Sequence, residues 1–236
     1  MALEVNNLSA GYAGQPVVNN LTFSVEKGQI VGLIGLNGAG KSTTLKQVVG
    51  LRQPLTGSLT LDGHDLAKEP AAYKAQLAYI PEQPVLYEEL TLDEHLHLNL
   101  AAHGQDDEEH WQRVEDLLSL FRLTDKGHWL PTHFSKGMKQ KVMLVAAFSL
   151  DVKLLVIDEP FLGLDVLAQK HLVTLMRKRS NDGAAVLLTT HLLSQAADYV
   201  DDFALLENGK LDFFGPATAL AEARSVSVLE LDELFS

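Results

Sequence analysis

The most constraining feature of the chain is a glycine-rich segment, GLNGAGKS, at residues 35–42. It satisfies the pattern G-x-x-x-x-G-K-[ST] and follows an almost continuously apolar run at residues 29–34, which is typical of a strand buried on both faces. A helix is expected to start at Lys41 and to stop at Gly50. A strand, a glycine-rich turn and a helix in this order predict a phosphate-binding loop in an α/β fold. The alternative, a plain glycine-rich turn with a solvated lysine, accounts for neither flanking element.

Each residue type in this loop has a use in binding a nucleoside triphosphate. Glycines let backbone N–H groups converge on phosphate oxygens in a concavity that side chains would block. Lys41 supplies a charge at the β- and γ-phosphates, the Ser42 hydroxyl reaches Mg²⁺, and Thr43 adds a second hydroxyl. The predicted nucleotide contacts are Gly35, Leu36, Asn37, Gly38, Ala39, Gly40, Lys41, Ser42 and Thr43.

The amino-acid composition argues against several other classes of function. The formal net charge of −12 argues against broad nucleic-acid binding, which needs a basic face. The absence of cysteine removes disulfides, thiol nucleophiles and cysteine-based zinc sites, and it fits a reducing cytoplasm. The first residues lack the pattern of a signal peptide, and no apolar run approaches the roughly 18 residues of a membrane helix. We therefore expect a soluble chain that reaches a membrane only through a partner.

The order of the predicted elements indicates a mostly parallel α/β core interrupted by helices. Strands are expected at residues 3–8, 21–25, 29–34 and 58–63, with another ending at Pro81. From about residue 91 to residue 150 the pattern is helical, and it opens with Thr91 and Glu94 as a capping box. Strands then return at residues 154–158, 185–189 and 203–207, alternating with helices at 165–179 and 192–199. Residues 210–216 and 228–235 predict a short strand and a terminal helix, without recognisable chemistry.

Two acidic residues follow the apolar run at residues 154–157. The pattern predicts a core strand that delivers Asp158 and Glu159 at its carboxyl end, which is where ligands bind in open α/β sheets. Asp158 matches the carboxylate that holds Mg²⁺ in phosphate-loop enzymes, usually through water. Glu159 is the candidate general base that polarises the attacking water. A surface pair of acids is the alternative interpretation, and the phosphate-binding loop upstream disfavours it.

Further motifs between and around these two resemble the ABC ATPases. Residues 134–141, FSKGMKQK, are similar to the signature loop of that family, and Gly163, Leu164 and Asp165 are similar to its D-loop. His191 resembles the switch histidine, and Tyr12 resembles the aromatic residue that stacks on adenine. Longer segments at residues 81–96, 133–143 and 157–165 resemble the Ecs-type ATP-binding subunit of Gram-positive bacterial transporters.

The resemblance implies one ABC ATPase domain over residues 1–236, with an N-terminal antiparallel β subdomain. Residues 1–83 and 151–236 would form the core with the β subdomain, and residues 84–150 would form an inserted helical subdomain that carries the signature loop. ATP and Mg²⁺ are the implied cofactors. The partners would be an integral-membrane permease, docked near residues 84–92, and a second ATP-binding domain, with the homodimer expected. The chain would then lie on the cytoplasmic face of the cell membrane.

The implied mechanism uses two domains that face each other head to tail. ATP bound to one phosphate loop would be clamped by Ser135 and Gly137 of the neighbouring domain, with Asp165 close by. Glu159 would position the attacking water and His191 would hold the γ-phosphate, so that hydrolysis powers transport, with export favoured. A non-transport ABC protein and a P-loop kinase or GTPase are the competing interpretations. The first usually carries two cassettes or a long coiled-coil insertion, and the second leaves the signature loop unexplained.

Three positions depart from the family pattern. Lys136 stands where a glycine is usual and Met138 where a glutamine is usual. The strand ending at Pro81 is normally followed by a glutamine that reaches Mg²⁺, and here Glu82 occupies that position with Gln83 after it. We expect Glu82 to take the role as a carboxylate, because a slip to Gln83 would disturb a connection constrained by two prolines.

Overall fold

The computed structural model describes residues 1–235, and its centre is a six-stranded sheet in the order β10-β9-β3-β8-β7-β6. The strands are β3 (Ile30–Ile34), β6 (Leu77–Ile80), β7 (Leu154–Ile157), β8 (Ala185–Thr189), β9 (Asp202–Glu207) and β10 (Lys210–Gly215). All neighbours pair in parallel except β10, which is antiparallel to β9. Every residue of β3, β7 and β8 is buried, as expected for parallel strands covered on both faces.

A second, four-stranded antiparallel sheet has the order β2-β1-β4-β5. Its strands are β1 (Leu3–Tyr12), β2 (Gln15–Val25), β4 (Thr56–Leu61) and β5 (His64–Asp65). β1 and β2 are longer than the sequence pattern indicated, because the chain turns at Ala13 and Gly14 with positive φ values of 50° and 76°. This turn gives a tight hairpin, and the two strands stay paired up to Tyr12 and Gln15.

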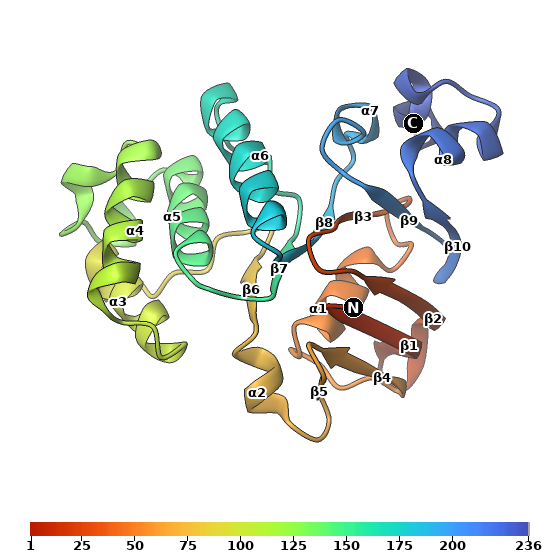
Figure 1. Cartoon of the computed structure of the whole chain (residues 1–236), viewed down its shortest axis with the longest axis horizontal. Helices are drawn as coiled ribbons and strands as arrows, with labels where there is room; N and C mark the ends of the chain where they lie inside the picture. Colours follow the sequence, from red (N-terminus) through yellow and green to blue (C-terminus); the bar gives the residue numbers. More distant parts are fainter. Residues whose placement is uncertain (236) are drawn as a thin grey trace.

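The helices fall into two groups. Figure 1 shows α3, α4 and α5 gathered at one end of the molecule and β1, β2 and β4 toward the other, while the six-stranded sheet extends from β6 near the middle to β10 beside β2. The three gathered helices are α3 (Leu92–Ala102), α4 (Glu108–Leu120) and α5 (Lys136–Phe148). The remaining helices are α1 (Lys41–Val48), α2 (Pro70–Lys74), α6 (Val166–Asn181), α7 (Leu193–Ala196) and α8 (Ala217–Arg224). The predicted α/β fold, with its antiparallel and helical subdomains, is confirmed.

Local capping explains where the helices of the first group begin. Thr91 accepts from the backbone N–H of Glu94, and the Glu94 carboxylate accepts from the backbone N–H of Thr91, which completes the predicted capping box. Asp107 caps α4 through the backbone N–H of His110. Short 3₁₀ turns at Thr124–Lys126 and Pro131–His133 connect α4 to α5.

Two expected elements near the C-terminus differ from the prediction. Residues 192–199 were expected to be one helix, but α7 covers only Leu193–Ala196. Residues 228–235 form the 3₁₀ segment η3 (Val228–Phe235) rather than an α-helix. The helix before it, α8, was not predicted from the sequence. Both segments are too short for intrinsic helix propensity to set their form, so tertiary contacts decide it.

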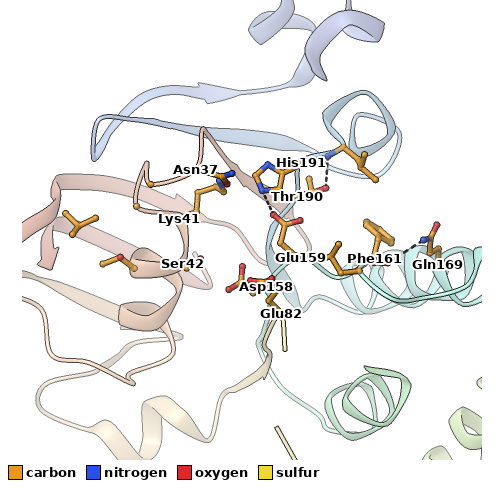
Figure 2. Close-up of a pocket in the computed structure, with 16 residues that line it drawn as sticks. Asn37, Lys41, Ser42, Glu82, Asp158, Glu159, Phe161, Gln169, Thr190 and His191 are labelled. Atoms are coloured by element: carbon orange, nitrogen blue, oxygen red, sulfur yellow. Dashed lines mark hydrogen bonds and ion pairs between the residues drawn. The ribbon is translucent and has the colours of Figure 1, made fainter. Parts of the chain in front are cut away.

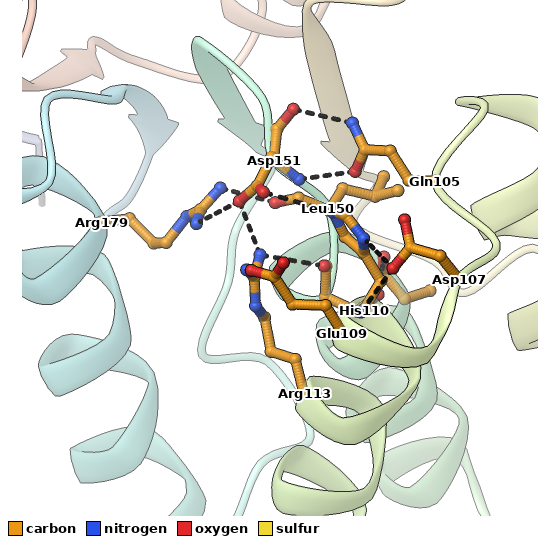
Figure 3. Close-up of polar contacts among 10 residues, drawn as sticks. Gln105, Asp107, Glu109, His110, Arg113, Leu150, Asp151 and Arg179 are labelled. Atoms are coloured by element: carbon orange, nitrogen blue, oxygen red, sulfur yellow. Dashed lines mark hydrogen bonds and ion pairs between the residues drawn. The ribbon is translucent and has the colours of Figure 1, made fainter.

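Charged side chains join the helical group to the core at Asp151, between α5 and β7 (Figure 3). Its Oδ1 accepts from Arg113 of α4 at 2.6 Å and from Arg179 of α6 at 3.3 Å. Nε2 of the buried His110 lies 3.2 Å from Oδ2 of Asp151. The Gln105 side chain bonds both backbone groups of Asp151, at 2.7 and 3.0 Å. This junction therefore links α4, α6 and the chain entering β7.

Apolar packing forms two clusters, one on each face of the central sheet. One joins the sheet to α3, α4, α5 and α6, and the other joins it to the antiparallel sheet and α1. No helix within residues 1–235 is both long and apolar enough to cross a membrane.

Candidate active site

A cavity of about 490 Å³ opens at the carboxyl ends of β3, β7 and β8. The phosphate-binding loop forms one wall, and the residues after β6, β7 and β8 form the opposite wall (Figure 2). It is lined by Val17, Asn37, Gly38, Gly40, Lys41, Ser42, Thr43, Glu82, Asp158, Glu159, Phe161, Leu162, Gln169, Thr190, His191 and Leu192. Residues from six separate stretches of the chain therefore meet around one space.

The loop backbone has conformations that favour glycine. Gly35, Gly38 and Gly40 have φ values of 145°, 83° and 108°. A Cβ atom at Gly40 would also lie 2.3 Å from Cγ1 of Val18, so this position excludes a side chain on steric grounds as well. The loop is thus held against the antiparallel sheet. Its Gly35, Leu36 and Ala39 do not line the main cavity; Leu36 and Ala39 line a smaller one of about 360 Å³ on the far side of the loop.

Lys41 is buried under the loop that precedes it. Its Nζ donates to the carbonyl oxygens of Gly35 at 2.6 Å and Leu36 at 3.2 Å. Burial lowers the pKa of Lys41, and the negative charges of Glu159 and Asp158 oppose that shift. The ammonium group of Lys41 therefore lies between the loop and the two carboxylates. Phosphate oxygens bound by the loop would lie close to this positive charge.

Thr189 organises the carboxylate pair, and the sequence interpretation did not include it. Its Oγ1 donates to Oδ1 of Asp158 at 2.7 Å and accepts from the backbone N–H of Glu159 at 2.9 Å. β7 and β8 are paired so that Ile157 faces Leu188, which brings Thr189 beside Asp158. Burial raises the pKa of Asp158, while the Thr189 hydrogen bond lowers it. The sequence did contain a signal for this role, because Thr189 places a hydroxyl at the end of the strand that pairs with the one ending in Asp158 and Glu159.

Glu159 has an unusual backbone conformation and a raised side-chain pKa. Its φ is 48°, in the left-handed region that a non-glycine residue rarely adopts and that recurs at functional sites. Burial, and next the charge of Asp158, raise the pKa of Glu159 to about 7. Its Oε1 lies 3.1 Å from Nε2 of His191 (Figure 2), whose own pKa is lowered by burial and by the charge of Lys41. A carboxyl with this pKa is suited to exchange protons near neutral pH.

Glu82 lines the cavity and lies beside Asp158 in Figure 2, whereas Gln83 is absent from the cavity wall. The Glu82 charge helps to raise the pKa of both Asp158 and Glu159. Ser42, Asp158 and Glu82 together offer hydroxyl and carboxylate oxygens, which suit Mg²⁺. Among residues 1–235 no group of three or more His, Asp and Glu side chains could hold a metal by itself. Phosphate oxygens would therefore have to complete the coordination.

The remaining predicted site residues lie outside the cavity wall. The Tyr12 ring is 41% exposed at the end of β1, and the Arg52 guanidinium lies 4.5 Å from its centroid. Ser135 caps α5 by accepting from the backbone N–H of Met138. A Cβ at Gly137 would lie 2.5 Å from the carbonyl oxygen of Gly163. The signature segment and the D-loop are therefore in close contact with each other.

Asp165 belongs to the same contact region. It caps α6 through the backbone N–H of Ala168 and forms an ion pair of 2.6 Å with Lys141 of α5. Gln169 lines the cavity and donates to the carbonyl oxygen of Leu164 at 3.2 Å. This chain of contacts runs from α5 through the D-loop to the wall of the cavity.

Residues 18–162 match the family described as "ABC transporter". The chain belongs to that family. The ABC-type transporter ATP-binding protein EcsA of Bacillus subtilis is 48% identical over 99% of this chain and 94% of that protein. The SkfA peptide export ATP-binding protein SkfE of the same organism is 33% identical over 89% of this chain and 87% of that protein.

A solved structure of an ATP-binding subunit of an ABC transporter superposes with a TM-score of 0.94. It is 48% identical in sequence, and the match covers 99% of this chain and 98% of that one. The resemblance to the ABC ATPases and to the Ecs-type subunit is thereby confirmed. This ABC chain binds ATP and is an ATPase.

Proposed function

We propose that this ABC chain is the ATP-hydrolysing subunit of a membrane transporter, and that two copies close head to tail around ATP. The observation that carries the proposal is the position of Ser135 and Gly137. Neither lines the cavity that contains Lys41 and Glu159 of the same chain. Contacts from the signature segment to a γ-phosphate would therefore come from a second copy, and they would be lost when that phosphate is lost.

Within one site, each residue has a separate role in our proposal. The loop N–H groups and Lys41 bind the phosphates and neutralise charge as it develops. Glu159 accepts a proton from the attacking water, and its pKa of about 7 supports this role at neutral pH. His191, which lines the same cavity as Lys41, contacts the γ-phosphate. Thr189 holds the carboxylates of this mechanism in place through the hydrogen bonds described above.

Two further contacts complete the nucleotide site. We propose that Ser42, Asp158 and Glu82 hold Mg²⁺, which when bound would polarise the phosphate oxygens. We propose that adenine stacks on the Tyr12 ring, whose exposure leaves it open to a planar ligand. The Arg52 guanidinium against the same ring would then hold its orientation.

A membrane permease is the second partner in this proposal. Val85 and Tyr87 are 74% and 64% exposed, in the segment between Glu82 and α3. His95 of α3 stacks on Tyr87, with ring centroids 5.7 Å apart, so the apolar segment is fixed to the helical group. We propose that a permease docks here, which places the chain on the cytoplasmic side of the membrane. The SkfE relative, named for peptide export, supports export as the direction.

The same reasoning supports the proposed division of the domain. Residues 84–150 contain the docking segment, α3, α4 and α5, and would move as a helical subdomain. Residues 1–83 and 151–236 would form the core with the β subdomain. Asp151 lies at the proposed boundary, where it joins both parts.

The Glu159→Gln variant tests the proposal directly. It keeps the loop and Lys41, so ATP binding persists, but it cannot accept the water proton. We expect an ATP-dependent dimer to accumulate in size-exclusion chromatography while hydrolysis is lost. Lys41→Ala is the control and should remain monomeric, because it lacks the phosphate contact. A Glu159→Gln chain that stays monomeric, or that hydrolyses ATP near the wild-type rate, would contradict the proposal.

A further inference from the structure

The short helix α7 follows His191 after a single residue and does not cap itself. Its four residues are too few to form a stable helix alone, and Leu192 at its start provides no side-chain cap. The backbone N–H groups of its first turn therefore need acceptors from elsewhere in the chain. His191 itself is about half exposed, with a side-chain exposure of 48%, so its own packing holds it only in part.

The missing acceptor is Asp232, which lies almost forty residues further along the chain. Its Oδ1 accepts from the backbone N–H of Leu193 at 2.5 Å and of Ser194 at 3.1 Å. Its Oδ2 accepts from the Ser194 hydroxyl. One carboxylate thus satisfies three donors at the start of α7, which is the role of a helix N-cap contributed by a distant segment.

The segment that carries Asp232 is anchored independently. Leu231 is fully buried in the core, and the backbone N–H of Ser227 donates to the Glu230 carboxylate at 2.9 Å at the start of η3. Figure 1 shows the C-terminal segment beside α7. On the other side of His191, Thr189 and Thr190 are buried at the end of β8. The chain on either side of His191 is therefore held by β8 before this residue and by η3 after it.

We infer that Asp232 is a positioning residue for ATP hydrolysis. By capping α7 it fixes the backbone on the C-terminal side of His191, so that Nε2 of His191 stays near Oε1 of Glu159. The inference rests on the proposed roles of His191 and Glu159. Asp232 lies outside the wall of the nucleotide cavity, so its effect on the reaction passes through the segment that it caps.

Three variants of this segment separate positioning from general stability. Asp232→Ala removes the cap, and we expect kcat for ATP hydrolysis to fall about ten-fold or more because His191 is displaced. KM for ATP should stay unchanged, since the phosphate-binding loop is untouched. Asp232→Asn should restore most of the rate, because its Oδ1 still accepts from both backbone N–H groups. Leu229→Ala is the matched control on the same turn, because Leu229 is 83% exposed, and it should keep the wild-type kcat.

Amide hydrogen exchange measures the cap itself in the same full-length proteins. Leu193 and Ser194 should exchange faster in Asp232→Ala than in wild type, while amides of β8 should not. A wild-type kcat in Asp232→Ala would overturn the inference. So would a loss of rate in Leu229→Ala equal to that in Asp232→Ala, because the effect would then belong to the whole turn.

A double variant tests the role of Asp232 separately from the proposed role of His191. If Asp232 acts through His191, adding Asp232→Ala to His191→Ala should lower the residual rate no further. An additional ten-fold loss would overturn the inference while leaving the role of His191 intact. A His191→Ala chain with full activity would instead overturn the proposed role of His191, and it is detected without any change at Asp232.

Discussion

At the scale of single residues, the candidate site concentrates negative charge that the fold only partly neutralises. Glu82, Asp158 and Glu159 line one cavity together with Lys41, and the charges of Lys46 and Lys41 act against the raised pKa of Asp158. The mutual repulsion of the carboxylates and their burial raise the pKa of Asp158 and Glu159. This charge would have to be balanced by a bound cation when a triphosphate arrives, which is the physical reason for the Mg²⁺ in our proposal.

Glu82 and Gln83 provide a direct comparison of adjacent side chains. Glu82→Ala removes an oxygen from the cavity wall, so we expect it to lower the ATPase rate stimulated by the permease about ten-fold or more. Gln83→Ala is the matched control, because Gln83 is absent from that wall, and its rate should stay within about two-fold of wild type. Nucleotide affinity, measured by equilibrium binding, should change little in either variant. The reverse order of the two rates would transfer the role to Gln83.

At the scale of elements, the molecule depends on caps and junctions formed over long distances in the sequence. α3 and α4 carry their own capping residues and could be located from the sequence. The cap of α7 comes from η3. Asp151 and the Lys141–Asp165 ion pair join the helical group to α6. These long-range contacts therefore connect the helical group and the segment after His191 to the core.

The Asp151 junction predicts a specific loss of stability. Burial alone would raise the pKa of Asp151, but hydrogen bonds and charges from Arg113 and Arg179 outweigh it and hold the pKa at about 2, below the usual 3.8. Asp151 therefore stabilises the fold above pH 3.8, and this contribution is lost as the pH falls through about 2. Because its side chain is 53% exposed, we expect Asp151→Ala to cost only about 1–2 kcal/mol at neutral pH.

Urea unfolding of the full chain at neutral pH and at about pH 2 measures this effect. The difference between Asp151→Ala and wild type should shrink at the acidic value, where the pH has reached the pKa of Asp151 in the folded protein and about half of these carboxyl groups are protonated. Asp116→Ala is the matched control, because Asp116 is exposed on the same helix as Arg113 and should change the midpoint little. A difference that is the same at both pH values would contradict the ion-pair explanation.

At the scale of the whole molecule, each active site in the proposed dimer takes its phosphate loop from one copy and its signature segment from the other. Lys41→Ala disables the first part, and Ser135→Asp disables the second by placing a negative charge against the γ-phosphate. Aspartate is a good N-cap, so the start of α5 is kept. Each variant alone should be nearly inactive.

Mixing the two variants should restore measurable ATPase activity, because in a mixed dimer one site lacks both parts and the other site lacks neither. Re-mixing wild type with Lys41→Ala controls for dilution of active chains. Activity is followed by release of inorganic phosphate at a fixed total protein concentration. A mixture as inactive as its two components would contradict shared sites.

The sequence by itself determined the fold and the class of chemistry. The loop at residues 35–42, the strand that ends in Asp158 and Glu159, and the position of His191 after a strand are local patterns. Local backbone preference and hydrophobic periodicity are enough to locate such elements, because they depend on residues within a few positions of one another. The family resemblance added the roles expected for Tyr12, Ser135 and Gly137, which stay predictions.

Only the tertiary structure decided which side chains meet. Thr189 reaches Asp158 through the register of two parallel strands, and Asp232 reaches α7 across almost the whole C-terminal segment. It also decided that Glu82, rather than Gln83, lines the cavity, and that Ser135 lies outside it. Such contacts depend on strand order and packing between distant segments, and a hydrogen-bonding side chain has no local pattern that names its partner.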